Sequence, residues 1–187
     1  MNILGIIASS KFGDVGDFES IATVSVGSGG ASDVEFTSIP ATFTHLQIRG
    51  IARSARSGET DDNIALRFNA DTGSNYAHHD LQGNGSSASA GAASSATSIR
   101  VAKVSAASAT ASVFGVCVFD ILDYANTNKY KTTRSLNGFD NNGSGNAVLF
   151  SGLWQNTNAI TSIKLFSQTG ANNFAQYSHF ALYGIRT

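Results

Sequence analysis

The chain has 187 residues and a net charge of −1; 42% of its residues are hydrophobic, but only 13% are charged. Globular domains contain about 25% charged residues on average, so this surface must be polar mainly through hydroxyl and amide groups. The only visible basic cluster, Arg49, Arg53 and Arg56, is interpreted as solvated or subunit-contacting side chains. We therefore expect no nucleic-acid binding, and no apolar run approaches the roughly 20 residues needed for membrane insertion as a helix.

The first segment, MNILGIIASS, is short and apolar and leads into a polar stretch. It does not fit a secretory signal peptide, because no Lys or Arg precedes Ile3 and the apolar part is too short. We predict that residues 1–18 form an extended N-terminal arm that docks on a partner. The side chains expected to bind that partner are Ile3, Leu4, Ile6 and Ile7. The alternative is that the arm packs on its own domain as an edge strand.

The segments ESIATVSV, HLQIRGIAR and NIALRFN alternate apolar and polar residues with a period of two, which is typical of strands with one buried face. The segments KYKTTRSL, AVLFSGLW, TSIKLFS and YSHFALYGIR continue the series of strand-like segments to the end of the chain. The run VFGVCVFDIL, residues 113–122, is apolar at both sets of alternate positions. This pattern predicts a central strand that is covered on both sides or lies in a subunit interface.

Segments rich in Gly, Asn, Asp and Ser separate the predicted strands, and these residue types favour turns. Short, regularly spaced strands with such turns predict an all-β fold, an antiparallel β-sandwich of jelly-roll type. We expect residues 19–187 to form this sandwich as a single domain with little helix. The most biased segment, from Gly83 to Ser98, is predicted to be a long flexible loop of small residues.

No segment carries a recognisable catalytic motif, and we expect a protein that is not an enzyme and needs no cofactor or metal. His78 and His79 are adjacent in a predicted strand, so their side chains should point to opposite faces. The single cysteine, Cys117, lies in an apolar run, as buried unreactive thiols do. The stretch DNNGSGN from Asp140 matches the first half of a calcium loop, but Ser151 stands where the final acidic ligand belongs. We interpret that stretch as a glycine-rich hairpin turn, with calcium binding as the alternative.

Six segments without a catalytic motif are distributed over nearly the whole chain after the arm: IATVSVGSGGASDVEFTSIPATFTHLQIRGIARS, LRFNADTGSNY, GNGSSASAG, FDILDYANTNKYKTTRSL, SGLWQNTNAITSIKL and FALYGIR. Together they resemble small virion structural proteins of tailed bacteriophages, notably phages of aquatic bacteria, and the arm segment ILGIIASSK is similar as well. The resemblance implies a homotrimeric β-sandwich on the exterior of a phage particle, made in the host cytoplasm.

From this resemblance we expect a non-enzymatic virion component, held by its arm on another virion protein, that serves as a tail fibre or receptor-binding appendage in host attachment. Two loops would then face the host and contact a surface glycan or protein. Their residues are Asn84, Ser86 and Ser87 in the first loop and Asp140, Asn142 and Ser144 in the second. The alternatives are a capsid decoration (cement) protein that stabilises the shell and, more remotely, a stand-alone carbohydrate-binding module.

Overall fold

The computed structural model describes residues 17–170 and 172–186, and within them the regular elements are twelve β-strands and no helix. The strands are β1 (Phe18–Ser25), β2 (Asp33–Phe36), β3 (His45–Ala52), β4 (Asp61–Phe68), β5 (Tyr76–Gly83), β6 (Ala88–Ala96), β7 (Ile99–Ser105), β8 (Gly115–Leu122), β9 (Lys131–Asp140), β10 (Gly145–Trp154), β11 (Ile163–Ser167) and β12 (His179–Ile185). No helix in these residues could cross a membrane. The predicted arm residues Ile3, Leu4, Ile6 and Ile7 lie outside the described part of the chain.

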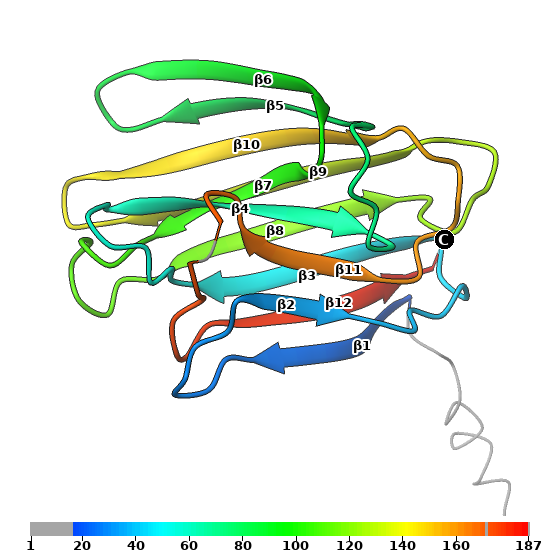
Figure 1. Cartoon of the computed structure of the whole chain (residues 1–187), viewed down its shortest axis with the longest axis horizontal. Coiled ribbons are helices and arrows are strands. Elements are labelled where there is room, and N and C mark those ends of the chain that lie inside the picture. The colour runs from blue at the N-terminus through cyan, green and yellow to red at the C-terminus, as the bar shows by residue number, and fades with distance from the viewer. Residues whose placement is uncertain (1–16, 171, 187) are drawn as a thin grey trace, which may run out of the picture.

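Two antiparallel sheets stack into a sandwich, which confirms the predicted fold class (Figure 1). The larger sheet has eight strands in the order β1-β12-β3-β8-β9-β10-β5-β6, and the smaller has four in the order β2-β11-β4-β7. Consecutive strands from β2 to β5 alternate between the sheets, as they do in a jelly roll. The hairpin β8–β9 is inserted between β3 and β10, and β12 and β1 extend the large sheet beyond β3. The large sheet therefore has twice as many strands as the small one.

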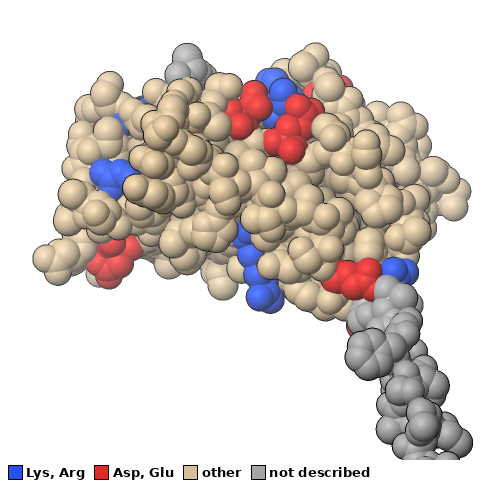
Figure 2. Space-filling model, turned by 90° about the horizontal axis from the view of Figure 1, so that it is seen from below, with Lys and Arg blue, Asp and Glu red and all other residues tan. Residues whose placement is uncertain are grey.

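The core lies between the two sheets and is formed by alternate residues of each strand, as the period-two patterns predict. The burial of β8 shows this alternation, since Cys117, Phe119 and Ile121 are buried while Val116 and Val118 are exposed. The largest apolar and aromatic side chains that are fully buried are Trp154, Tyr76, Tyr124, Phe68, Phe119, Phe174 and Phe180. Figure 2 shows one face of the molecular surface, on which a few charged groups are scattered among uncharged residues.

The prediction of a long flexible loop from Gly83 to Ser98 is wrong. The segment contains β6, which pairs antiparallel with β5 from Ala88 opposite Gly83 to Ala96 opposite Tyr76. Alanine and serine have low intrinsic preference for strands, so local sequence did not indicate this element. The strand forms at the edge of the large sheet because its main chain pairs with β5.

The interpretation of Arg53 as a solvated or subunit-contacting side chain is also wrong. Its guanidinium binds four main-chain oxygens of the loop before β8: Ala107 (3.2 Å), Ala109 (3.0 Å), Thr110 (2.8 Å) and Val113 (2.8 Å). Arginine can satisfy several carbonyl acceptors at once because its donors spread in a planar fork. Arg53 therefore holds the β7–β8 connection in place.

Candidate functional site

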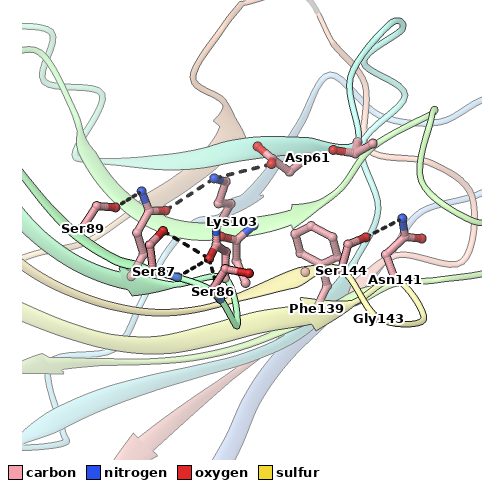
Figure 3. Close-up of a pocket in the computed structure, with 14 residues that line it drawn as sticks. Asp61, Ser86, Ser87, Ser89, Lys103, Phe139, Asn141, Gly143 and Ser144 are labelled. Carbon is pink, nitrogen blue, oxygen red and sulfur yellow. Dashed lines mark hydrogen bonds and ion pairs between the residues drawn. The ribbon is translucent and has the colours of Figure 1, made fainter.

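A polar pocket of about 480 Å³ lies at one end of the sandwich (Figure 3). The tips of the β5–β6 and β9–β10 hairpins project from this same end, and the first residues of β4 and Lys103 of β7 complete the lining (Figure 1). The lining residues are Thr60, Asp61, Gln82, Asn84, Ser86, Ser87, Ser89, Lys103, Phe139, Asn141, Gly143, Ser144, Gly145 and Asn146. The volume falls within the roughly 300–1,000 Å³ of ordinary small-molecule sites.

The first wall of the pocket is the turn that joins β5 to β6. Oδ1 of Asn84 accepts hydrogen bonds from the main-chain nitrogens of Ser86 (3.0 Å) and Ser87 (2.9 Å). The main-chain nitrogen of Asn84 also donates to the oxygen of Ser87 at 3.2 Å. Gly85, which lies between Asn84 and Ser86, has a φ of 88°, a left-handed conformation that glycine adopts without a steric penalty. Asn84 thus fixes the loop that carries both serine hydroxyls.

The second wall is the turn between β9 and β10. Asn142 and Gly143 have φ values of 56° and 99°, and the main-chain nitrogen of Asn141 donates to the oxygen of Ser144 at 2.5 Å. Two successive positive φ values with an Asn-Gly pair are the signature of a type I′ hairpin turn. Oδ1 of Asp140 closes the turn by accepting hydrogen bonds from the main-chain nitrogens of Asn142 (2.7 Å) and Gly143 (3.4 Å).

This geometry confirms the interpretation of DNNGSGN as a glycine-rich hairpin turn. The carboxylate of Asp140 folds back on its own turn. Within residues 17–170 and 172–186, no three His, Cys, Asp or Glu side chains come together as a group that could hold a metal ion. The turn is also tied to the rest of the protein, because Oδ1 of Asn141 accepts a hydrogen bond of 2.6 Å from the main-chain nitrogen of Thr110.

The charged groups in the pocket are paired with each other. Nζ of Lys103 lies 3.4 Å from Oδ2 of Asp61 and donates a hydrogen bond of 3.4 Å to Oε1 of Gln82. The amide nitrogen of Gln82 in turn donates to Oγ of Ser89 at 3.0 Å (Figure 3). Lys103 and Asp61 cancel in net charge, so the rest of the lining offers neutral hydroxyls, amides and the edge of the Phe139 ring.

The lining consists mainly of groups that can form hydrogen bonds with a polar ligand. Asp61 is the only acidic residue of the lining, and it is engaged by Lys103, so the pair of carboxylates used in glycoside hydrolysis is not assembled here. The lining contains no histidine or cysteine that could act as a base or nucleophile. Hydroxyl and amide groups beside an aromatic ring match the chemistry of a neutral polar ligand such as a saccharide.

Four of the six predicted loop residues line the pocket: Asn84, Ser86, Ser87 and Ser144. Asp140 lines an adjoining hollow on the outer face of the large sheet, and Asn142 lies at the tip of its turn and lines neither. The structure therefore brings the two predicted loops together, although they are far apart in the sequence.

Sequence reasoning missed the strand residues of the pocket, above all Lys103, Gln82 and Phe139. Lys103 interrupts the short apolar run VAKV, residues 101–104, which is the one local sign that its side chain reaches a polar site. Nothing in the local sequence marks Gln82 or Phe139, because their place in the pocket depends on how the hairpins pack.

The other residues considered for chemistry have structural roles. His78 is buried, His79 is exposed on the opposite face, and Nδ1 of His78 lies 3.5 Å from the main-chain nitrogen of Arg100 as an acceptor. Cys117 is buried, and burial raises the pKa of its thiol to about 12.

A buried carboxylate, Asp62, forms the densest polar cluster in the core. It accepts hydrogen bonds from the hydroxyls of Ser54 (2.7 Å), Ser167 (2.8 Å) and Thr169 (3.1 Å). Nη1 of Arg56 lies 3.7 Å from its Oδ1. These partners satisfy the carboxylate, so the cluster links β4 to β11 rather than forming a reactive site.

Comparisons of the chain with protein-family models, with curated proteins and with solved structures find no match.

Proposed function

We propose that this protein is a non-enzymatic surface component of a tailed-phage virion, a tail fibre or receptor-binding appendage that contacts the host through the polar pocket. The observation that carries the proposal is the meeting of the β5–β6 and β9–β10 turns in one pocket, since both turns contain loop residues expected to face the host. The virion itself is inferred from the resemblance of the strand segments.

The chemistry of the pocket favours a neutral glycan as the host ligand. Its free groups are hydroxyls and amides, and its one lysine is neutralised by Asp61. Both turns are held by hydrogen bonds of their own, through Asn84 and Asp140, so little conformational entropy is lost on binding. Such contacts are individually weak, and several copies on one particle would raise the overall affinity through multivalency.

The N-terminal arm is the proposed attachment to the virion. Ile3, Leu4, Ile6 and Ile7 would insert into another virion protein, with each fully buried side chain contributing about 1.5–3 kcal/mol before ordering costs. Replacing all four residues with serine should abolish incorporation into particles while the isolated domain still folds.

A capsid decoration protein is the second candidate. The observation that favours it is a set of exposed apolar side chains on the outer face of the large sheet, which a neighbouring protein could cover. Quantitative mass spectrometry of purified particles separates the candidates. A few copies for each particle support an appendage, copies in proportion to the capsid protein support decoration, and absence from particles contradicts both and favours the carbohydrate-binding module.

The pocket is tested by binding of the purified protein to host cells and to isolated host-surface polysaccharide. Asn146 lines the pocket, and Asn146→Ala should weaken binding about tenfold, the effect of losing roughly 1.4 kcal/mol. The matched control is Asn128→Ala, which alters an exposed asparagine in the turn before β9, at the other end of that strand. Equal binding by both variants would contradict the assignment of the pocket.

A further inference from the structure

The outer face of the large sheet carries an uninterrupted row of apolar side chains. Leu81 of β5 lies opposite Leu149 of β10, Leu149 opposite Leu136 of β9, and Leu136 opposite Val118 of β8. Their exposed fractions are 55%, 44%, 66% and 38% in that order. The row is about 15 Å wide, because neighbouring strands are about 4.8 Å apart. We call these four residues the leucine row.

A second row runs parallel to the leucine row and is made mostly of small residues. Gly83, Ala147, Gly138 and Val116 are consecutive cross-strand partners on β5, β10, β9 and β8. They line a hollow of about 540 Å³ that also reaches the tip of the β9–β10 turn. A second hollow of about 310 Å³ lies where Ala88 and Ala147 adjoin the leucine side chains. A ridge and a depression therefore lie side by side on one face.

The two rows from β5 to β8 contain no charged side chain, although Asp140 also lines the hollow where it reaches the β9–β10 turn. The next row contains His79, Ser151, Arg134 and Asp120, which are again consecutive partners. Nη2 of Arg134 lies 3.1 Å from Oδ2 of Asp120, so these charges are paired within the chain. The solvent face of an antiparallel sheet is ordinarily polar, and contiguous apolar patches of more than a few hundred Å² are rare on monomers.

We propose that this face pairs with the same face of a second copy of the chain. Two copies related by a twofold axis would each place a leucine row against the small-residue row of the other, which is the self-complementarity that an isologous contact requires. The two rows on β5, β10, β9 and β8 form the apolar centre of such a contact, and flanking side chains of the same face supply the rest of the roughly 800 Å² per partner that a stable interface buries.

This pairing explains why β8 is apolar on both faces. Cys117, Phe119 and Ile121 fill the core of the chain, while Val116 and Val118 would be covered by the second copy. A membrane is a poorer occupant, because surface-bound apolar faces are usually flanked by free basic residues, and Arg134 is paired with Asp120. A face-to-face pair is a dimer, whereas the resemblance to virion proteins implies a trimer, so the mass of the assembly separates the two arrangements.

The test is the mass of the full chain in solution, measured by light scattering on a sizing column over a range of micromolar concentrations. The wild-type chain should have twice the monomer mass. Leu136→Lys should halve that mass while the chain still folds and unfolds cooperatively, because Leu136 is 66% exposed and does not belong to the core. Tyr130→Lys is the control: this side chain is 53% exposed just before β9, away from the leucine row, and its replacement should leave the dimer intact.

Three outcomes would overturn the proposal: a monomeric wild-type chain, a wild-type trimer, or a Leu136→Lys variant that remains dimeric. Should Leu136→Lys fail to fold, Leu149→Ser in the same row makes the same test with a smaller change. Binding of a monomeric wild-type chain to anionic vesicles would assign the face to a membrane instead, and this also overturns the proposal. Glycan binding is measured separately with Ser89→Ala, which alters the pocket and neither hollow of this face, so failure of the dimer leaves the pocket assignment standing.

Discussion

The indole Nε1 of Trp154 donates a hydrogen bond of 2.7 Å to Oδ2 of Asp71, a residue 83 positions earlier in the chain. Trp154 ends β10 in the large sheet, and Asp71 lies in the connection that follows β4 of the small sheet. The same carboxylate accepts hydrogen bonds from the main-chain nitrogen of Gly73 and the side chain of Asn75, each at 2.8 Å. Asp71 therefore fixes the β4–β5 connection and joins it to the other sheet.

Replacing Asp71 with Asn should lower the free energy of unfolding by about 1–2 kcal/mol at neutral pH, because hydrogen bonds to a charged acceptor are stronger than those to a neutral one. Urea denaturation measures the change. Asp33→Asn is the matched control, since Asp33 lies on the surface 3.7 Å from Lys164, and its replacement should cost less than about 1 kcal/mol.

The effect of Asp71 should depend on pH. Hydrogen bonds from Asn75, Gly73 and Trp154 hold the pKa of its carboxyl below the ordinary value, although partial burial opposes them. A carboxyl whose pKa is lowered by folding stabilises the protein above its unfolded pKa of about 3.9, and that stability is lost as the pH falls through the folded pKa. The difference in stability between wild type and Asp71→Asn should therefore shrink below about pH 4. A difference that stays constant down to pH 2.5 would contradict this.

Lys131 is fully buried, and its ammonium group donates to the main-chain oxygens of Asn126 (2.6 Å), Lys129 (2.9 Å) and Thr157 (2.9 Å). Lys131→Met keeps the aliphatic chain but leaves three carbonyl groups without this donor. We expect a loss of about 3 kcal/mol or more in unfolding free energy. Lys129→Met, two residues away, removes only an ion pair between a half-exposed lysine and Asp123 and should cost less than about 1 kcal/mol. Equal melting temperatures for both variants would rule out the role given to Lys131.

Cys117 should not react with thiol reagents while the protein is folded. Burial raises the pKa of its thiol to about 12, so almost no thiolate exists at pH 8, and the side chain is only 2% exposed. A colourimetric disulfide reagent should detect no thiol in the native protein and one thiol for each chain in concentrated urea. Rapid labelling before unfolding would show that β8 opens locally.

Gly152 of β10 has no room for a side chain. A Cβ atom there would clash with Cγ2 of Ile99 and Oγ1 of Thr133. Gly152→Ala should destabilise the protein by about 1–3 kcal/mol, since both neighbours belong to the packed interior and must shift. Gly29→Ala is the control, because a Cβ atom at Gly29 would have no atom within 4 Å, and its melting temperature should match the wild type closely.

The alternation of apolar and polar residues predicted the strands that bury one face. It did not predict a strand that is defined only by main-chain hydrogen bonds to its neighbour. Leu46 and Ile48 of β3 alternate with polar residues and are buried as expected. The residues of β6 are almost all Ala and Ser, so no apolar period marked the strand, and only its register with β5 defines it. Arg53 was misjudged for a related reason, because its four carbonyl partners lie more than 50 residues further along the chain.

The residues of the candidate site also fall into two groups, those that the sequence could indicate and those that it could not. Asn84 and Ser144 could be found because turn residues are recognisable from composition. Lys103 and Phe139 could not, since they lie on strands and reach the pocket only through the packing of β7 beside the two hairpins. The leucine row is likewise invisible along the chain, because its four members come from four separate strands that align only in the folded register.

The pairing of β1 with β12 constrains the order of events during synthesis. Phe18 pairs with Ile185, so the first described strand finds its hydrogen-bonding partner only after translation has passed the last strand. The hairpins β5–β6 and β9–β10 close locally and can form early, while contacts between distant segments carry a larger entropic cost and form late. During translation, β1 therefore has no strand to pair with until β12 leaves the ribosome and completes the edge of the large sheet.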